Sequence, residues 1–413
     1  MPHSRGIITI LLVIIVGLCR VTSCSSFPTV LLEGFSTFSG RQHFMLCRRT
    51  LWTRIPSRVV ARTMYLLSER DVEKALNLQD CLDATRQAFV SITQQTAAVP
   101  TRLGLPYPHN PNKIASSPPS SSSNNNNNNN NPDATTSPLD WTLFKPAAYY
   151  GGTNEDSDIA MGLKIVSIRS SNPSMGLPLV PATILLLDPV TGMVDATLGG
   201  TYLTVARTSA GPALAVQTFC PQVQELVLFG AGAQAECHVH LMQLALQRTI
   251  PRITIVNRSL ERAEALRTKL HQQHHPQEPG GHQEIQVLRL DDYDAVNAAL
   301  SSADVISATT NTATPLWQDG SLLKPNCLIT GIGSYTPDMQ EIPESAVNRC
   351  QVIIDTPEAK EVGDLKHLPP HHPVTLAGHA LENPTDILEA TTSTTTTTTT
   401  TDCIFYKAVG TAI

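Results

Sequence analysis

The segment from Glu225 onward constrains the fold most, because short apolar runs alternate there with helical patterns. ELVLFGAG predicts a strand that leads into a helix over 233–248, followed by strand ITIV and a helix over 260–272. Strand IQVLRL comes next, then a helix and a strand in DDYDAVNAALSSADVISATT, and strands in CLITGIGS and CQVIIDT. This alternation predicts an α/β fold with a doubly wound parallel sheet that carries helices on both faces.

The turn after the first of these strands, over 230–235, reads GAGAQA and is the GxGxxA form of the Rossmann-type dinucleotide fingerprint. The first glycine permits the tight turn, and the second lets backbone amides approach a pyrophosphate. The pyrophosphate would rest on the helix N-terminus, where unpaired N–H groups favour an anion. We therefore expect Gly230, Gly232, Ala233 and Gln234 to bind a dinucleotide cofactor. The alternative is a glycine turn kept only for packing.

The residues after the second strand predict which dinucleotide binds. NAD sites commonly place an acid there for the ribose 2′-hydroxyl, whereas this chain has Asn257, Arg258 and Ser259. An arginine is suited to pair with a 2′-phosphate, so NADP(H) is favoured and NAD(H) is the alternative. Simple solvation of Arg258 is the other interpretation of that residue.

The residues after the fourth strand of this segment are a second candidate for cofactor contact. Thr309, Thr310 and Asn311 stand at a strand C-terminal end, where the ligand crevice of such sheets forms. A helix cap is the alternative interpretation of these three residues.

The chain before Glu225 predicts an α+β part. From Met64, a short strand is followed by a helix with Ser68 as its N-cap. VPTRLGLPYP is extended, and TLFKPAAYY, MGLKIVSIRS and VPATILLLDPVTGMVDATLGG are expected strands, the last a hairpin about its DPVTG turn. YLTVARTSAGPALAVQTF is an expected helix, and low-complexity tracts at about 111–138 and 391–401 are expected to be disordered inserts.

Residues 1–63 differ from the rest of the chain and are expected to lie outside the fold. Ile7–Cys19 is an apolar run typical of a signal-peptide core, whereas the arginine-rich, acid-poor stretch after it is typical of an organelle transit peptide. A third possibility, which we favour, is that this extension is not translated and the protein starts at Met64. The expected location is then cytoplasmic, with a mitochondrial or secretory location as the alternative if the extension is real.

The net charge and the spacing of the cysteines limit which partners and metal sites this chain is expected to have. A net charge of -6 argues against a nucleic-acid partner, which would call for a basic surface. The 9 cysteines show neither CxxC pairs nor metal-ligand spacing. We therefore expect reduced thiols and no metal site.

A hydride carrier needs a partner surface that holds the substrate, and three cations are candidates for it. Arg102 lies in VPTRLGLP, Lys164 lies between apolar neighbours in GLKIV, and Arg207 follows YLTVA at the start of a helix. On composition alone the common fate of such residues is exposure at a sheet edge or at a helix terminus.

From Met64 to Ile413 the chain resembles the ornithine cyclodeaminase/mu-crystallin family. The matching stretches, in order, are LSERDVEKAL, VPTRLGLPYP, GLKIVSIRSSNPSMGLPLVPATILLLDPVTG, YLTVARTSA, VLFGAGAQAECHVHLMQL, ITIVNRS, GIGSYTPDMQEIP, VGDLKHL and YKAVGTA. The resemblance implies an NAD(P)-dependent homodimer. Residues 64–206 and 364–413 would form the substrate-binding and dimerisation domain, and 207–363 an inserted Rossmann domain.

The resemblance also implies roles for single residues. Arg102 and Arg207 would bind the substrate carboxylate, and Lys164 would face the reacting nitrogen or carbonyl. Two guanidinium groups bind a carboxylate with charge-assisted hydrogen bonds, and burial lowers the pKa of a lysine so that it exchanges a proton near neutral pH. Cyclodeaminases of the family carry an acid where this chain has Tyr335. Asp338 is the nearest carboxylate and a candidate catalytic residue, with a loop or helix-cap role as the alternative.

Together these features predict an NADPH-dependent reductase of small α-imino acids, which run in reverse is an amino-acid dehydrogenase. One alternative is an ornithine cyclodeaminase, which converts ornithine to proline plus ammonia without net use of the cofactor. The other is a non-catalytic NADPH-dependent binding protein of the mu-crystallin type. Proline or amino-acid metabolism is the setting that the resemblance implies.

Overall fold

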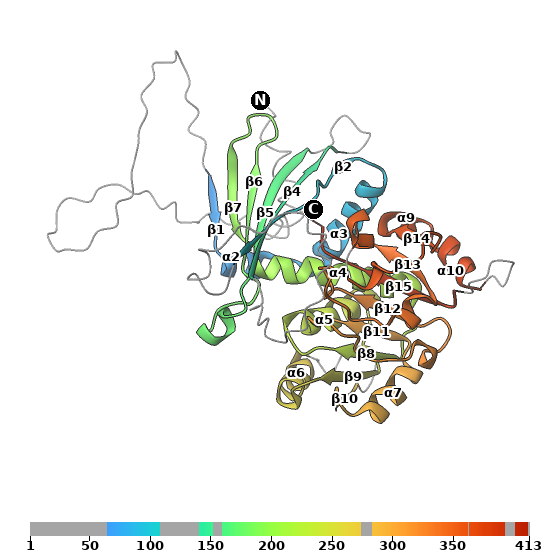
Figure 1. Cartoon of the computed structure of the whole chain (residues 1–413). Helices are drawn as coiled ribbons and strands as arrows, with labels where there is room; N and C mark the ends of the chain where they lie inside the picture. The colour runs from blue at the N-terminus through green and yellow to red at the C-terminus, as the bar shows by residue number, and fades with distance from the viewer. Residues whose placement is uncertain are drawn as a thin grey trace, which may run out of the picture.

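A computed structural model of the chain describes residues 64–107, 140–151, 159–273, 283–361, 363–392 and 401–411. The extension 1–63 and the expected insert at 111–138 lie outside the described residues, as do 393–400 of the second insert. No helix among the residues described is both long and apolar enough to cross a membrane. Two sheets organise the described chain, one built before Glu225 and the other from it onward (Figure 1).

The first sheet has seven strands in the order β1-β7-β6-β5-β4-β2, and β3 also pairs with β4. The strands are β1 (Tyr65–Leu67), β2 (Ala97–Ala98), β3 (Leu103–Tyr107), β4 (Asp140–Tyr149), β5 (Ala160–Ile168), β6 (Ala182–Leu187) and β7 (Val194–Gly199). The predicted hairpin is confirmed as β6 and β7, whose turn closes through a 2.8 Å hydrogen bond from Gly192 N to Asp188 O. A 3-10 helix, η2 (Asn172–Met175), follows β5.

Two helices form where the sequence predicted one helix after Ser68. Ser68 caps α2 (Glu69–Ala75) in a capping box with Asp71, as its hydroxyl predicts. The helix ends at Ala75, with Leu76 as its C-cap. Asn77 then caps a second helix, α3 (Leu78–Thr93), which buries Leu82 and Phe89. A new N-cap side chain within the pattern therefore divides it into two helices.

The second sheet is parallel throughout and has eight strands in the order β10-β9-β8-β11-β12-β15-β13-β14. They are β8 (Glu225–Phe229), β9 (Arg252–Asn257), β10 (Glu284–Arg289), β11 (Val305–Ala308), β12 (Leu328–Gly331), β13 (Cys350–Ile354), β14 (Val374–Leu376) and β15 (Cys403–Lys407). The chain runs from β8 outward to β9 and β10, then returns to β11 on the other side of β8. This reversal is the switch point at which ligands bind in Rossmann-type sheets.

Helices cover both faces of this sheet, so the predicted doubly wound fold is confirmed. They are α5 (Ala233–Leu246), α6 (Leu260–Gln273), α7 (Tyr293–Ser302), α8 (Glu344–Val347), α9 (Ala377–Glu382) and α10 (Pro384–Thr392), with 3-10 helices η3 (Gly320–Leu322), η4 (Pro357–Glu361) and η5 (Gly363–Leu365). Alternate residues of β8 pack on opposite faces: Leu226 and Leu228 join one core, and Val227 and Phe229 join the other. A strand with two buried faces needs such a continuous apolar run.

The end of the chain lies in the second sheet, which corrects the expected division. We assigned 364–413 to the substrate-binding domain, but β14 and β15 both pair within the parallel sheet, and β15 lies between β12 and β13. All five residues of β15 are buried, as an interior parallel strand requires. Of this segment, α9 packs against α3 of the N-terminal part. The tract at 391–401 also starts later than expected, because α10 extends to Thr392.

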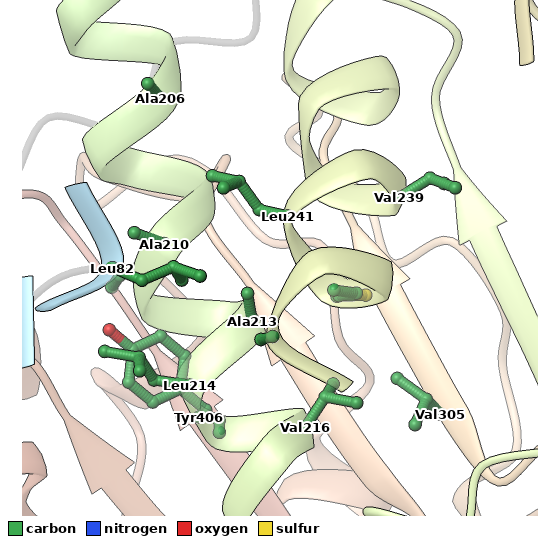
Figure 2. Close-up of a cluster of buried hydrophobic side chains, with 14 of the residues drawn as sticks. Leu82, Ala206, Ala210, Ala213, Leu214, Val216, Val239, Leu241, Val305 and Tyr406 are labelled. Atoms are coloured by element: carbon green, nitrogen blue, oxygen red, sulfur yellow. The ribbon is translucent and has the colours of Figure 1, made fainter. Parts of the chain in front are cut away.

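Helix α4 (Thr201–Phe219) connects the two sheets, since it contacts β6 of the first and α5 and β12 of the second (Figure 1). Its buried positions are mostly small, and Figure 2 shows Ala206, Ala210 and Ala213 along it, with Leu241 of α5 beside them. Small side chains let the helix axes approach closely. Arg207 lies inside α4 and not at its start, because the helix begins at Thr201.

We predict that position 211 of α4 must be glycine, because the side chain of Tyr406 leaves no room for a larger residue. A Cβ atom at Gly211 would lie 2.2 Å from the hydroxyl oxygen of Tyr406, which is buried and has no hydrogen-bond partner among the described residues. Gly211→Ala should therefore lower the free energy of unfolding by about 1–3 kcal/mol through overpacking. Tyr406→Phe removes the obstructing oxygen, so the cost of Gly211→Ala should fall by at least half in that background. Urea denaturation of the four proteins of this cycle measures the effect. An equal cost in both backgrounds would contradict the packing argument.

Candidate active site

The glycine turn between β8 and α5 has the geometry of a pyrophosphate site. Gly230 has a φ of +109°, and a Cβ there would lie 2.6 Å from the Thr309 hydroxyl oxygen. Gly232 is the N-cap of α5 and offers no side-chain cap, and a Cβ built on it meets nothing within 4 Å. The first amides of α5 therefore have no side-chain cap, which fits an anionic group at this helix end. Ala233 is exposed, Gln234 is half-buried, and Ala235 is fully buried where the helix packs on the strand.

The loop after β9 leaves a cation at the position where an acid would bind a ribose hydroxyl. The Asn257 side-chain amide donates to Ser259 O at 2.9 Å. The Ser259 hydroxyl accepts from Arg262 N, in the first turn of α6, at 3.3 Å. Arg258 is exposed between them and has no ion pair with another described residue. The loop therefore offers an unpaired guanidinium to a ligand at the end of β9.

The residues after β11 are held by the neighbouring strand ends. Thr309 donates its hydroxyl to Phe229 O at 2.8 Å, so it joins the end of β11 to the end of β8. Thr310 gives both its backbone N–H and its hydroxyl to the Glu341 carboxylate, at 2.8 and 2.7 Å. Asn311 is exposed and forms a side-chain hydrogen bond with Tyr335. All three predicted residues thus lie at the edge of the switch point.

Four cations gather around one turn, at 408–411, that follows β15; they come from β4, from β5, from α4 and from the residue just before β3. Arg102 donates to Val409 O at 3.1 Å, and Lys145 of β4 donates to Gly410 O at 2.9 Å and to Val409 O at 3.4 Å. A Cβ built on Gly410 would lie 2.8 Å from a terminal nitrogen of Arg207. Lys164 of β5 is the register partner of Lys145.

Arg102 also links this turn to a second loop of the parallel sheet. Its other terminal nitrogen donates to Tyr335 O at 3.1 Å. One guanidinium group from the first sheet thus contacts two loops of the second sheet, at its C-terminal edge. The three cations predicted from the sequence are therefore brought together, and Lys145 joins them.

The turn is fixed by a buried carboxylate. Asp355, at the end of β13, accepts hydrogen bonds from Val409 N at 3.1 Å and from Gly410 N at 2.7 Å. Gly410 has a φ of +81°, a conformation that side chains other than glycine rarely adopt. Burial raises the pKa of Asp355, and the backbone hydrogen bonds and Lys145 oppose that rise. The Asp355 carboxylate thus binds backbone N–H groups of the turn and stabilises its conformation.

Two of the four cations are buried, the two arginines are half-buried, and none of the four has an anionic partner among the described residues. Lys164 is 5% exposed and Lys145 is 6% exposed. Within the described part of the chain, Arg102, Lys145, Lys164 and Arg207 form no ion pair, and Lys164 and Arg207 have no hydrogen-bond acceptor. Charged side chains are almost never fully buried unless they are paired. The cluster is therefore a candidate binding site for an anionic ligand.

Burial also shifts the acid–base behaviour of these cations. Desolvation lowers the pKa of Lys164 well below its usual value, and the charges of Arg207 and Lys145 lower it further. Desolvation, then Arg207 and Arg102, lower the pKa of Lys145 to about 7, against the opposing effect of Asp355 and Glu358. Both lysines thus exchange protons more readily than an exposed lysine.

The family model of the ornithine cyclodeaminase/mu-crystallin family matches residues 152–386, more than half of the chain. The chain belongs to the ornithine cyclodeaminase/mu-crystallin family. The resemblance found in the sequence is thereby confirmed.

Relatives of this family match the chain to different extents. An uncharacterized cyclodeaminase of Dictyostelium discoideum is 29% identical over 366 residues, which cover 85% of this chain and 93% of that protein. A Delta(1)-pyrroline-2-carboxylate reductase of Bacillus cereus is 30% identical over 211 residues, which cover 50% of this chain and 60% of that protein. The solved structure of Thermococcus litoralis Delta(1)-pyrroline-2-carboxylate reductase in complex with NADH and L-proline has a TM-score of 0.62 and 20% identity, over 84% of this chain and 92% of that one. The last likeness shows the fold.

Asp338 does not join the cation cluster. It is exposed in the turn 336–339, which closes through a hydrogen bond from Met339 N to Thr336 O at 3.2 Å. Tyr335, at the place of the acid of the family's cyclodeaminases, is half-buried, and its backbone carbonyl accepts from Arg102. Burial raises the pKa of the Tyr335 phenol, with Asn311 and Arg102 opposing the rise. Tyr335 thus contacts one cation of the cluster through its backbone, whereas Asp338 forms no hydrogen bond or ion pair with any of the four among the described residues.

Sequence reasoning missed a second set of buried charges, which positions the loops around the site. Asp364 accepts from Glu341 N at 2.6 Å and from Ile342 N at 2.9 Å, and it pairs with the fully buried Lys407 at 3.0 Å. Glu341 in turn accepts from Gly333 N at 2.6 Å. The sequence did contain a signal for two of these residues, because Lys407 in CIFYKAVG and Glu341 in MQEIP are charged residues inside apolar stretches. Among the residues described, no group of three or more histidine, cysteine and acidic side chains could hold a metal ion.

Proposed function

We propose that the protein is an NADPH-dependent reductase of small α-imino acids. The observation that carries the proposal is the group of two buried lysines and two half-buried arginines around the turn at 408–411, which have no anionic partner among the described residues. The group lies beside the edge that holds the glycine fingerprint. An α-imino acid brings a carboxylate next to the carbon that accepts hydride. The Bacillus cereus relative, named as a Delta(1)-pyrroline-2-carboxylate reductase, supports the same class of reaction.

The residues at the site fit a nicotinamide dinucleotide, and the others have separate roles in substrate binding and in proton transfer. The amides of the turn at 230–235 would hold the pyrophosphate, and the bound cofactor supplies hydride to the C=N carbon. Arg102 and Arg207 would bind the substrate carboxylate and orient that carbon. Lys164 would give a proton to the nitrogen, so that C=N plus hydride and proton becomes CH–NH.

The lowered pKa of Lys164 suits this proton transfer. A lysine with an unshifted pKa of about 10.4 would hold its proton too firmly at neutral pH. Burial, then Arg207 and Lys145, bring the pKa of Lys164 down. Binding of a carboxylate places a negative charge nearby, which favours the protonated form that the reaction needs.

Removal of Lys164 tests this role. Lys164→Ala should lower kcat for imino-acid reduction by roughly 100- to 10,000-fold, the range for loss of a general acid. In the wild type, kcat/KM should fall as the pH rises through the pKa of Lys164, and this break should lie below pH 10.5. Oxidation of NADPH followed at 340 nm, with Δ1-pyrroline-2-carboxylate as substrate, measures both effects. Lys269→Ala, on exposed α6, is the matched control. Undiminished oxidation of NADPH by Lys164→Ala would remove Lys164 from this role.

The same assay separates the two alternative functions. An ornithine cyclodeaminase would release ammonia from ornithine with no net change in NADPH. The exposed position of Asp338 and the phenol of Tyr335 argue against it, because a phenol of pKa about 10 is a poor replacement for a carboxylate base. A non-catalytic protein would bind NADPH and show no turnover with any imino acid.

We also propose that Arg258 sets a preference for NADP(H) over NAD(H). It is exposed, unpaired among the described residues and adjacent to the end of β9, where a 2′-phosphate would lie. Arg258→Asp should raise KM for NADPH at least tenfold while changing KM for NADH far less, because an acid repels the phosphate and accepts from the ribose hydroxyl. Arg267→Asp, further along α6, is the control. Equal changes for both cofactors would contradict the assignment.

A homodimer is our proposal for the assembly. On β3, Leu103, Leu105 and Tyr107 are 61%, 50% and 50% exposed and alternate with less exposed residues, so one face of this strand presents an apolar row. Exposed apolar surface of this kind marks an interface. Sedimentation should give twice the chain mass for the wild type and a single chain mass for the double variant Leu103→Glu/Leu105→Glu. A wild-type monomer at micromolar concentration would exclude the homodimer.

A further inference from the structure

Lys145 is the one cation of the cluster to which neither the sequence nor the proposed reaction gives a task. It lies on β4 directly opposite Lys164 on β5 in an antiparallel pair. Side chains of such opposite residues leave the same face of the sheet, with Cβ atoms about 4.5–5.5 Å apart. Both side chains therefore lie on the same side of the sheet, and one small ligand can contact both ammonium groups.

The hydrogen bonds of Lys145 leave it one donor for a ligand. An ammonium group has three N–H donors. Within the described part of the chain its acceptors are the carbonyl oxygens of Val409, at 3.4 Å, and Gly410, at 2.9 Å. Carbonyl oxygens orient the ammonium group but leave its charge uncompensated.

The charges of the cluster exceed those of a single carboxylate. Arg102 and Arg207 suffice to bind one carboxylate in the proposed reaction, and Lys164 acts on the nitrogen. Asp355, the nearby buried acid, directs its oxygens to backbone N–H groups of the turn and not to a cation. Lys145 is then a buried cation left over beside the substrate, which is costly unless an anion faces it.

We propose that Lys145 binds a second anionic group on the substrate, so that the preferred substrates are α-imino acids with a short carboxylate-bearing side chain. This inference rests on the proposed function and narrows its substrate class to dicarboxylic imino acids. The amino acid formed then carries one or two methylene groups between its α-carbon and its second carboxylate.

The protonation of Lys145 supports a role that depends on the ligand. Its pKa of about 7 reflects burial, then Arg207 and Arg102, with Asp355 and Glu358 acting in the opposite direction and Lys164 facing it from β5. The side chain is therefore only partly charged in the free protein at neutral pH. A second carboxylate beside it raises this pKa, so the dianionic ligand generates the cation that binds it.

The test compares two ligands of nearly equal shape that differ in one charge, L-aspartate and L-asparagine. Their inhibition constants are measured at pH 7 against imino-acid reduction by the wild-type dimer and by Lys145→Met, Lys145→Arg and the control Lys269→Met. Wild type should bind aspartate about 10- to 100-fold more tightly than asparagine, the range of a charge-assisted hydrogen bond. Lys145→Met should bring the two constants within about twofold of each other, and Lys145→Arg should keep a preference for aspartate.

Other outcomes overturn the inference. Equal constants in the wild type would show that Lys145 meets no second anion. An equal loss for both ligands in Lys145→Met, with the aspartate preference kept, would show that Lys145 only supports the turn at 408–411. NADPH binding, followed by fluorescence, establishes that each variant is folded, and Lys145→Arg carries the comparison if Lys145→Met is not.

Failure of this inference is distinguishable from failure of the proposed function. Turnover is measured with ammonia plus oxaloacetate and with ammonia plus pyruvate. Reduction with pyruvate but not with oxaloacetate overturns the dicarboxylate class and leaves the reductase intact. If neither mixture nor Δ1-pyrroline-2-carboxylate is reduced, the proposed function fails. The aspartate and asparagine comparison is then made by direct binding to the NADPH complex, where a lack of preference again overturns the inference.

Discussion

The insertion of β15 between β12 and β13 is the constraint on which the rest of the site depends. This strand comes from the end of the chain, yet it pairs on both sides inside a parallel sheet. Its insertion brings Lys407 to the buried Asp364 and places the turn at 408–411 at the C-terminal edge of the sheet. The cations of the first sheet then have carbonyl oxygens to contact. Without β15 they would have neither an anchor nor a common position.

Two buried lysines and two half-buried arginines around one turn have an energetic consequence for the protein as a whole. Each ion taken out of water costs several kcal/mol unless a partner compensates it. Asp355 compensates in part from behind the turn, and lowered lysine pKa values reduce the charge that must be buried. Under the proposed function, an anionic substrate that binds the folded state alone would remove the remaining imbalance of charge. The ligand and the cofactor should therefore stabilise the protein by mass action, in proportion to their affinities.

The sequence predicted most of the parallel sheet, because its strands are continuous apolar runs separated by helical patterns, and it predicted the glycine turn because few residues tolerate that backbone. It misplaced β15 because CIFYK follows a threonine tract at the end of the chain, and its burial depends on partners far away in the sequence. Arg102, Lys164 and Arg207 came from a family resemblance and not from their local patterns. Lys145 was missed because a lysine before a proline in TLFKPAAYY has no local signature. Only the pairing of β4 with β5 brings it beside Lys164.

The two halves of the site come from different sheets, so its chemistry depends on their relative position. The first sheet supplies Lys145 and Lys164, and the second supplies the glycine turn and the turn at 408–411. Arg207 belongs to α4, the helix that contacts both sheets and whose small residues allow close packing on α5. Displacement of α4 by even one ångström would move Arg207 relative to the glycine turn. In the proposed reaction this would shift the carboxylate relative to the hydride donor, and a change of that size costs roughly 100-fold in rate. The close packing of α4 thus serves the geometry of the reaction as well as the stability of the fold.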